Sequence, residues 1–310
     1  MSEAPPILPR TALPHEVLRS ALDALDRGAR VVLASVVARH GSAPSTPGQK
    51  LVLLDERTAV GTIGGGAVER VVLLRMLEAL EDREIAPRLE TFRLGASLGM
   101  CCGGSVDLLI EPLEPLAHVL VVGAGHVGVF TAPLLAAAGF RVTLCDTRPA
   151  AADPARLADL PPPPSPEGSM VTPSPVRVIL AEHDDPEVRA ALPAALGRAA
   201  LLVMTHDHQL DQTVIEWALR HGFGFVGGVG SRAKAARTRA RLEAKGIAAA
   251  DIERVRMPVG ADISARSPAE IGVAIAAELI AWRARVLDRR APGPRAPAGA
   301  GEASADEVNA

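Results

Sequence analysis

Tyrosine is absent from this 310-residue sequence, and other aromatic residues are few, with five Phe and two Trp. Any mechanism that needs a tyrosine acid is therefore excluded, including that of short-chain dehydrogenases with a Tyr-x-x-x-Lys pair. Long apolar runs are absent too. Hydrophobic residues make up 48% of the chain, yet no charge-free run reaches the roughly 20 residues that cross a bilayer. We therefore expect no membrane association.

The sequence also lacks strong charge and a cysteine framework. Its net charge is −3 with no long basic run, so a nucleic-acid partner has no electrostatic support. Three cysteines are too few for a disulfide framework and indicate a reducing compartment. The N-terminal segment MSEAPPILPR has an early acidic residue and no apolar core, so it does not predict a secretory signal. We expect a cytoplasmic protein.

The hydrophobic pattern predicts two domains and a tail. Residues 1–115 are expected to form a small α+β domain, and residues 116–286 a Rossmann-type α/β domain with a parallel sheet, because strands alternate there with helices. A proline-rich excursion at 149–175 and a tail at 287–310 predict no regular structure. The helices expected in the second domain cover 127–138, 185–196, 209–221, 231–245 and 267–286.

A glycine-rich turn opens the second domain. The sequence Gly123-Ala124-Gly125-His126-Val127-Gly128 follows an apolar strand and begins a helix, and Asp146 ends the next strand. This context is typical of a dinucleotide site: Gly125 lets the backbone approach a pyrophosphate, and Asp146 can accept hydrogen bonds from a ribose diol. The alternative is that the glycines serve the turn alone and no ligand binds. His126 is interpreted as a residue that packs within the loop.

Two adjacent cysteines, Cys101 and Cys102, lie in the glycine-rich loop LGASLGMCCGGS at 94–105. Adjacent cysteines rarely form a disulfide, and the flanking glycines expose backbone N–H groups that stabilise a thiolate. The loop therefore predicts a reactive thiol or a soft-metal site. The alternative is that both cysteines are small buried residues in a turn. Cys145, within a strand, is expected in the core.

Two further strand ends carry polar residues. In THDH at 205–208, His206 and His208 can ligate a metal or transfer protons together with Asp207 and Asp211, although helix capping by one of these carboxylates competes with that interpretation. In GGVGSRAK at 227–234, Ser231 is the expected N-cap and Arg232 a phosphate contact.

Two loops of the first domain, HGSAPSTPGQK at 40–50 and GTIGGGAVE at 61–69, are similar to anion-binding nests. Ordinary turn chemistry explains each loop equally well by itself. Neither loop has the Lys-Ser/Thr pair of a Walker motif, so ATP chemistry is not expected.

The chain resembles the XdhC/CoxI family of maturation factors for molybdenum hydroxylases such as xanthine dehydrogenase. The resemblance covers nearly the whole chain and rests on the order and spacing of seven motifs. They are GSAPSTPGQKLVLL (41–54), GTIGGGAVE (61–69), GMCCGGSVDLLIEPL (99–113), VVGAGHVG (121–128), VMTHDH (203–208), GGVGSR (227–232) and MPVGADISARSPAEIGVAIAAELIA (257–281).

The resemblance implies a chaperone that binds the molybdenum cofactor in its molybdopterin form, protects it, supports its sulfuration and delivers it to the xanthine dehydrogenase apoenzyme. It also implies a cysteine desulfurase as sulfur donor. The family's G-x-x-C-G-G cysteine corresponds to Cys102, which is the candidate metal ligand or persulfide carrier. The candidate cofactor-binding residues are Cys101, Cys102, Gly103, Gly104, Gly123, Gly125, His126, Gly128, Asp146, His206, Asp207, Ser231 and Arg232.

Two other functions fit the residues. The first is an NAD(P)-dependent oxidoreductase, which the glycine turn and Asp146 favour but for which the sequence lacks a typical hydride-transfer constellation. The second is a protein adaptor that binds no cofactor. A nucleotide in the Rossmann domain is compatible with the chaperone function as well. A cleft between the domains is the expected cofactor site, and a homodimer is the expected oligomer.

Overall fold

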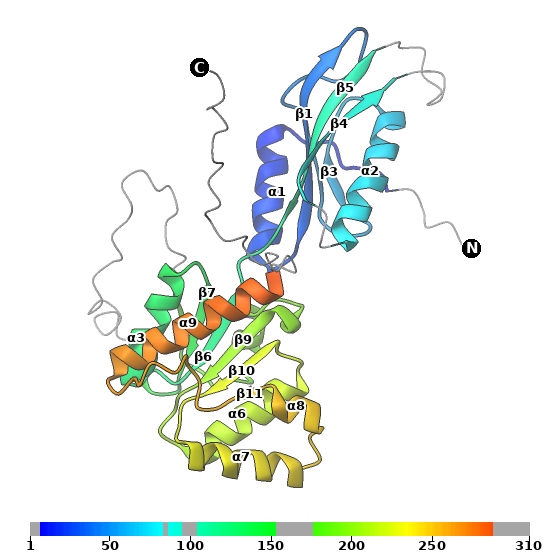
Figure 1. Cartoon of the computed structure of the whole chain (residues 1–310). Coiled ribbons are helices and arrows are strands. Elements are labelled where there is room, and N and C mark those ends of the chain that lie inside the picture. The colour runs from blue at the N-terminus through cyan, green and yellow to red at the C-terminus, as the bar shows by residue number, and fades with distance from the viewer. Residues whose placement is uncertain (1–6, 83–85, 95–103, 153–175, 288–310) are drawn as a thin grey trace, which may run out of the picture.

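The computed structural model describes residues 7–82, 86–94, 104–152 and 176–287, and within them two separate β-sheets form. The first sheet belongs to the small N-terminal domain and the second to a Rossmann-type domain, as the sequence predicts (Figure 1). Most of the proline-rich excursion and almost all of the expected tail lie outside the described residues.

The N-terminal domain is a five-stranded antiparallel sheet with one helix on each face (Figure 1). Its strand order is β3-β2-β1-β5-β4. Its elements are α1 (Pro14–Asp26), β1 (Val31–His40), β2 (Lys50–Leu53), β3 (Ala59–Gly61), α2 (Gly66–Glu81), β4 (Arg88–Arg93) and β5 (Ser105–Leu113).

Alternating residues of β1 supply both cores of this domain. Val31 and Leu33 pack with α1, whereas Val32, Ala34 and Val36 pack with α2. Successive side chains of a strand point to opposite faces, so a run of apolar residues can support two helices.

The second domain has a six-stranded parallel sheet in the order β11-β10-β9-β6-β7-β8. The chain order along this sheet is that of a dinucleotide-binding fold, in which the strand order reverses between β6 and β9. The strands are β6 (His118–Val122), β7 (Arg141–Cys145), β8 (Arg177–Ile179), β9 (Ala199–Val203), β10 (Phe225–Gly228) and β11 (Val255–Arg256).

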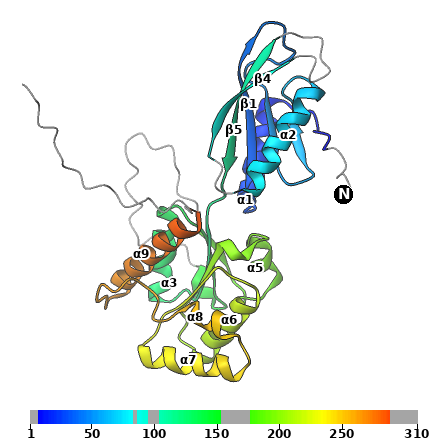
Figure 2. The same ribbon diagram turned by 45° about the vertical axis from the view of Figure 1, so that its right-hand side comes forward.

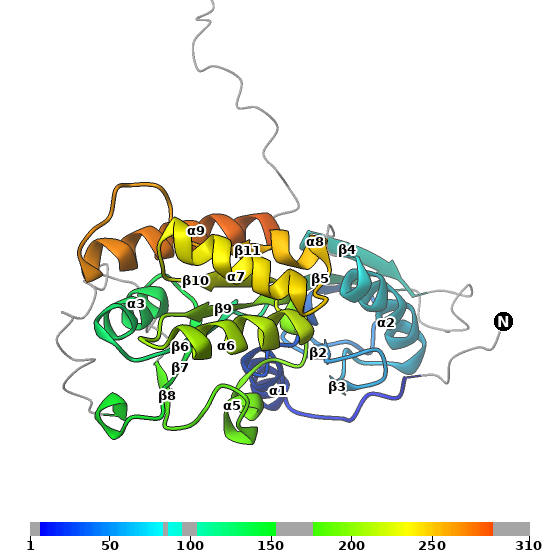
Figure 3. The same ribbon diagram turned by 90° about the horizontal axis from the view of Figure 1, so that it is seen from below.

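Helices cover both faces of this sheet, and for that reason β6 and β9 are buried along their full length. The helices α3 (His126–Ala137) and α9 (Pro268–Leu287) pack on one face. The helices α6 (His208–Arg220) and α7 (Arg232–Ala244) lie side by side on the other face (Figure 3). The shorter helices are α5 (Pro186–Ala191) and α8 (Ala249–Glu253), with 3-10 turns at Pro149–Ala152 and Leu196–Arg198.

Some elements differ from the sequence-based expectation. A helix was expected over 185–196, but α5 ends at Ala191 because Pro193 disfavours helical geometry in the residue before it and cannot donate a helical hydrogen bond. The strands β3 and β11 were not predicted, since three and two residues are too few for a periodic signal. Buried Cys145 confirms the core position expected for it.

The two domains meet at the amino edge of the parallel sheet. Strand β5 leads directly into β6 through residues 114–117 (Figure 2). There the Glu114 carboxylate lies 2.8 Å from the guanidinium of Arg30 and 2.7 Å from that of Arg198, so one acid bridges both domains. Arg141, the first residue of β7, contacts Asp26 at the end of α1.

Candidate cofactor site

The turn between β6 and α3 has a backbone conformation that requires glycine at two of its positions. Gly123 has a φ of 109°, and a Cβ there would stand 2.8 Å from the Met204 carbonyl oxygen. A Cβ on Gly128 would stand 2.0 Å from the Gly123 carbonyl oxygen. Both positions therefore exclude any other residue without a backbone shift.

Gly125 differs from these two, because a Cβ there would meet no heavy atom within 4 Å. The backbone at Gly125 therefore faces open space. Gly125 is the N-cap of α3 and no side chain caps this helix. The first N–H groups of a helix lack intrahelical acceptors and carry a partial positive charge. His126, the first residue of α3, is exposed and not packed within the loop as expected, so together with the turn it offers a place for a phosphate.

Asp146 follows β7 and lies beside this turn. Its Oδ2 accepts hydrogen bonds from the Ala124 N–H at 2.7 Å and from the Arg148 guanidinium at 2.6 Å. Its Oδ1 accepts two more, both at 2.9 Å, from the backbone N–H and Nε of Arg148. Burial favours the neutral acid, but these hydrogen bonds and the charge of Arg148 outweigh it and lower the pKa of Asp146 to about 2.

This bonding changes the predicted role of Asp146. Each carboxylate oxygen already accepts two hydrogen bonds, so a ribose diol could bind Asp146 only after Arg148 moved away. In the structure the carboxylate instead holds the glycine turn in place through Ala124. The Arg148 side chain is 48% exposed and can swing into solvent.

A pocket of about 520 Å³ lies at the carboxyl edge of the sheet, next to the strand-order reversal. Gly123 and Asp146 line it together with Arg148, His183 and His206. Ligands of open α/β sheets bind at this edge. Two predicted site regions, the glycine turn and the THDH segment, therefore meet at one pocket.

The THDH segment has a structural role in addition to its position. Asp207 caps α6 by accepting hydrogen bonds from the N–H groups of Gln209 and Leu210, which confirms the capping alternative for one carboxylate. Asp211 is buried and binds Lys234 at 2.5 Å and the Thr205 hydroxyl at 2.7 Å. Asp211 therefore links α6 to α7, and its carboxylate is already paired with the Lys234 ammonium.

Ser231 and Arg232 lie at the other half of the same edge. The Ser231 hydroxyl accepts a hydrogen bond from the Lys234 N–H and caps α7, as predicted. Arg232 lines a second pocket, of about 870 Å³, together with Gly230 and Gly260. The structure thus does not place Arg232 in the pocket that Asp146 and His206 line.

The glycine-rich loops of the first domain converge on one another. A Cβ on Gly104 would stand 2.5 Å from the His40 carbonyl oxygen, and one on Gly64 would stand 2.5 Å from the Ser45 Cα. Segment 40–45 therefore contacts both of the other loops. Within this cluster the hydroxyl of Ser45 is fully buried and has no hydrogen-bond partner.

The GTIGGG loop is less suited to an anion than its glycines suggest. The Glu69 carboxylate accepts hydrogen bonds from the Thr62 hydroxyl at 2.5 Å and from the Ile63 N–H at 3.2 Å. The Glu69 carboxylate therefore already occupies the place where the sequence predicted that this loop would bind an anion.

The first-domain cluster and the Rossmann pocket do not face each other within the described chain. Val31 pairs with Leu113 beside the domain junction, whereas His40 pairs with Ser105 at the far end of the sheet. At about 3.3 Å per residue, the cluster lies roughly 30 Å from the junction along the strand. The Rossmann pocket lies at the carboxyl edge, opposite the junction. Cys101, Cys102 and Gly103 lie outside the described residues.

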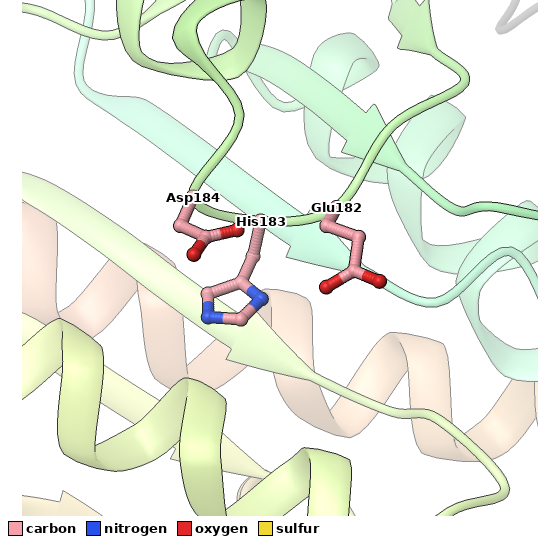
Figure 4. Close-up of side chains that lie close together, drawn as sticks. All are labelled: Glu182, His183 and Asp184. Atoms are coloured by element: carbon pink, nitrogen blue, oxygen red, sulfur yellow. The ribbon is translucent and has the colours of Figure 1, made fainter.

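Three consecutive polar residues after β8 were not predicted as site residues from the sequence. Glu182, His183 and Asp184 place their ligand atoms within 4.8 Å of one another (Figure 4). His183 is buried, and burial lowers its pKa, with partial compensation by the charges of Asp184 and Glu182. The available signal was the run Glu-His-Asp-Asp after the third strand of the parallel sheet, where a ligand edge was already expected.

The sheet order, the glycine turn and the pocket at the carboxyl edge define a two-domain protein with a Rossmann-type domain. Residues 119–279 match the family model described as the XdhC Rossmann domain, and residues 24–93 match that of the XdhC and CoxI family. The chain belongs to the XdhC and CoxI family, as the sequence resemblance predicts.

Two curated proteins are similar to the chain at 30% identity. One is the uncharacterized protein YqeB of Escherichia coli (strain K12), aligned over 80% of this chain and 42% of its own length. The other is described as a probable subunit of xanthine dehydrogenase from Bacillus subtilis (strain 168), aligned over 59% of this chain and 48% of its own length. The chain thus spans less than half of each relative.

Among solved structures, a crystal structure described as a xanthine dehydrogenase from Bacillus halodurans aligns with a TM-score of 0.44 at 17% identity. The alignment covers 91% of this chain and 98% of that chain. Within the part of the chain that the structure describes, no helix has the length and apolar character needed to cross a membrane.

Proposed function

We propose that this protein binds the molybdenum cofactor in its molybdopterin form, protects it, supports its sulfuration and delivers it to xanthine dehydrogenase. The observation that carries the proposal is the open backbone at Gly125, at the uncapped N-terminus of α3. Molybdopterin ends in a phosphate, and this helix terminus fits such an anion. Family membership and the relative named for xanthine dehydrogenase favour this cargo and this recipient.

The residues present fit the cargo in two respects. The backbone N–H groups at the start of α3, from Gly125 to Gly128, would hold the phosphate, and the adjoining pocket offers polar groups for a pterin. When bound, the cofactor supplies a molybdenum centre that the recipient enzyme uses for its chemistry. The chain's own residues bind and orient the cofactor.

Cys102 is proposed to contact the molybdenum or to carry the sulfur that a cysteine desulfurase provides, with Cys101 as its neighbour. The thiolate is the chemically suitable group, since soft sulfur ligands suit such centres. Gly104 lies roughly 30 Å from the junction, and the Rossmann pocket lies on the far side of that junction. Cys102 is therefore proposed to act on a cofactor held by a second copy of the chain or by the recipient enzyme, and not on one in the pocket of its own chain.

The test is metal and pterin analysis of protein purified from cofactor-producing cells. We expect close to one molybdenum and one pterin per chain. The Gly125→Val variant should bind less of both, because the valine side chain would fill the open space beside the backbone at this position. Cys102→Ala should yield recipient enzyme that lacks the exchangeable sulfur. Wild-type protein without molybdenum would contradict the proposal. Molybdenum loading and sulfuration that Cys102→Ala leaves unchanged would contradict the role of that cysteine.

A second candidate function is an NAD(P)-dependent oxidoreductase, which the pocket beside Gly123 and Asp146 favours. The saturated hydrogen bonding of Asp146 argues against tight binding of a ribose diol. Retention of a nicotinamide cofactor without molybdenum, together with a substrate-dependent change in absorbance, would favour this candidate. Binding of the dehydrogenase with neither cofactor retained would indicate a protein adaptor.

A further inference from the structure

The segment after β8 forms a tight turn that gathers three side chains. The turn is closed by a hydrogen bond from the Asp185 N–H to the Glu182 carbonyl oxygen at 3.2 Å. Asp185 then caps α5 through the Glu187 N–H at 2.8 Å. Because the chain reverses here, the side chains of Glu182, His183 and Asp184 lie on the same side of the loop (Figure 4).

These side chains present one imidazole nitrogen and two carboxylate oxygens within 4.8 Å of one another. A transition-metal ion binds such atoms at about 2.0–2.2 Å and therefore holds its ligands within about 4 Å of one another. Glu182 and Asp184 are exposed, so small side-chain rotations can bring their oxygens to that spacing.

An independent observation points to a ligand at this place. His183 is only 4% exposed, yet its Nδ1 is buried without a hydrogen-bond partner. A buried polar nitrogen in this state costs about 1–3 kcal/mol, so native proteins normally satisfy it. The Trp217 ring fixes the imidazole edge-on, with ring centroids 5.2 Å apart and planes at 88°. The nitrogen is therefore held in position and lacks only a partner.

We propose that Glu182, His183 and Asp184 bind one divalent first-row transition-metal ion, such as Mn²⁺ or Zn²⁺, at the rim of the pocket that Asp146 lines. An imidazole with two carboxylates suits these ions, whereas Mg²⁺ and Ca²⁺ prefer oxygen ligands alone. Two carboxylates also balance the charge of a divalent cation.

The position of the ion gives it access to ligands. Glu182 and His183 both line the pocket beside the glycine turn, so an ion that they hold keeps a coordination position open toward it. An oxygen atom of a molecule in the pocket can occupy that position. This metal site does not depend on the molybdenum cofactor. If the metal site proved absent, the proposed function would be unaffected.

The test uses Mn²⁺ with the full chain after removal of bound metals by a chelator. Mn²⁺ avoids the thiolates, which select softer ions. We expect electron paramagnetic resonance to count one bound ion per chain. The ion should also broaden the indole NMR signal of Trp217 far more than that of Trp282, which packs against Phe225 on the opposite face of the sheet.

Variants of the two exposed carboxylates make the test specific. Glu182→Gln and Asp184→Asn should each weaken Mn²⁺ binding by about tenfold or more, because even an indirect contact to a metal ligand commonly contributes that much. Glu187→Gln on α5 is the matched control and should leave the affinity unchanged, since Glu187 lies outside the cluster.

Three results would each overturn the proposal. The first is the absence of Mn²⁺ and Zn²⁺ binding in the folded wild-type chain. The second is a binding affinity that both carboxylate variants leave unchanged, and the third is equal broadening of the two indole signals. His183→Gln is informative only if its circular dichroism remains native, and for that reason the exposed carboxylates carry the test.

Discussion

The ion pair between Lys234 and Asp211 holds together the edge of the sheet that carries the ligand pocket. The Lys234 Nζ lies 2.5 Å from Asp211 Oδ2, and the two side chains are 12% and 2% exposed. The same Nζ donates to the Val229 carbonyl oxygen at 3.2 Å. Asp211 Oδ1 accepts from the backbone N–H and the hydroxyl of Thr205. The pair therefore joins α6 and α7 to the ends of β9 and β10.

Replacing Lys234 by Met should lower the free energy of unfolding of this domain by about 3–5 kcal/mol. The change keeps most of the side-chain volume but leaves the Asp211 carboxylate buried without its counter-charge, which is the costly case for a buried pair. Replacing both residues, in Asp211→Asn with Lys234→Met, removes the uncompensated charge. The double variant should therefore be about 2 kcal/mol more stable than Lys234→Met alone.

Tryptophan fluorescence during urea unfolding measures this domain selectively. The chain has two tryptophans, Trp217 on α6 and Trp282 on α9, and both belong to the Rossmann domain. Lys245→Met is the matched control, because Lys245 pairs with Glu216 at 2.6 Å while remaining 49% exposed. It should cost at most about 1 kcal/mol. The reasoning would be refuted by a Lys234→Met variant as stable as the control, or by a double variant no more stable than Lys234→Met.

Three further predictions concern the glycine turn and its surroundings. Gly128→Ala should destabilise the Rossmann domain by about 1–3 kcal/mol through its 2.0 Å clash, whereas Gly125→Ala should stay within about 0.5 kcal/mol of wild type; thermal unfolding distinguishes them. The folded pKa of Asp146, about 2, lies below its unfolded value, so its contribution of about 2 kcal/mol is full above about pH 5 and declines as the pH falls toward 2. Wild type and Asp146→Asn should therefore converge in stability at acidic pH in urea unfolding series, and a constant difference would contradict this assignment. Burial, followed by the charge of Asp146, raises the pKa of the Cys145 thiol to about 12. Iodoacetamide should therefore alkylate Cys145 only after the protein unfolds. Mass spectrometry that finds rapid labelling of the Cys145 peptide in native protein would disprove this.

Local rules were sufficient for the glycine turn and the caps. Gly123, Gly125 and Gly128 between a strand and a helix predicted the turn, because a Cβ at Gly123 or Gly128 would clash with the backbone and one at Gly125 would fill the space left for a ligand. Ser231 and Asp207 cap α7 and α6, and each donor lies within three residues of its acceptor in the sequence. Such contacts depend on neighbouring residues alone, so the sequence contains them.

Contacts between distant segments were beyond the same rules. Asp146 was expected to be available to a ribose, yet the turn amide of Ala124, which is 22 residues away, and Arg148 fill its acceptor positions. Asp211 was open to a metal or acid–base role, but the cation that occupies it lies 23 residues further along the chain. Neither partner can be identified without knowing which strand ends share an edge.

By itself, the sequence determined the family, the two domains, the parallel order of strand and helix, and the turn that suits a phosphate. These features follow from periodicity and from the backbone freedom of glycine, which are local properties. Only the tertiary structure decided that the glycine turn and His206 share one pocket, that His183 lacks a partner beside two carboxylates, and that the first-domain loops lie far from the junction. Those facts depend on sheet order and strand direction, which bring together residues that no local pattern connects.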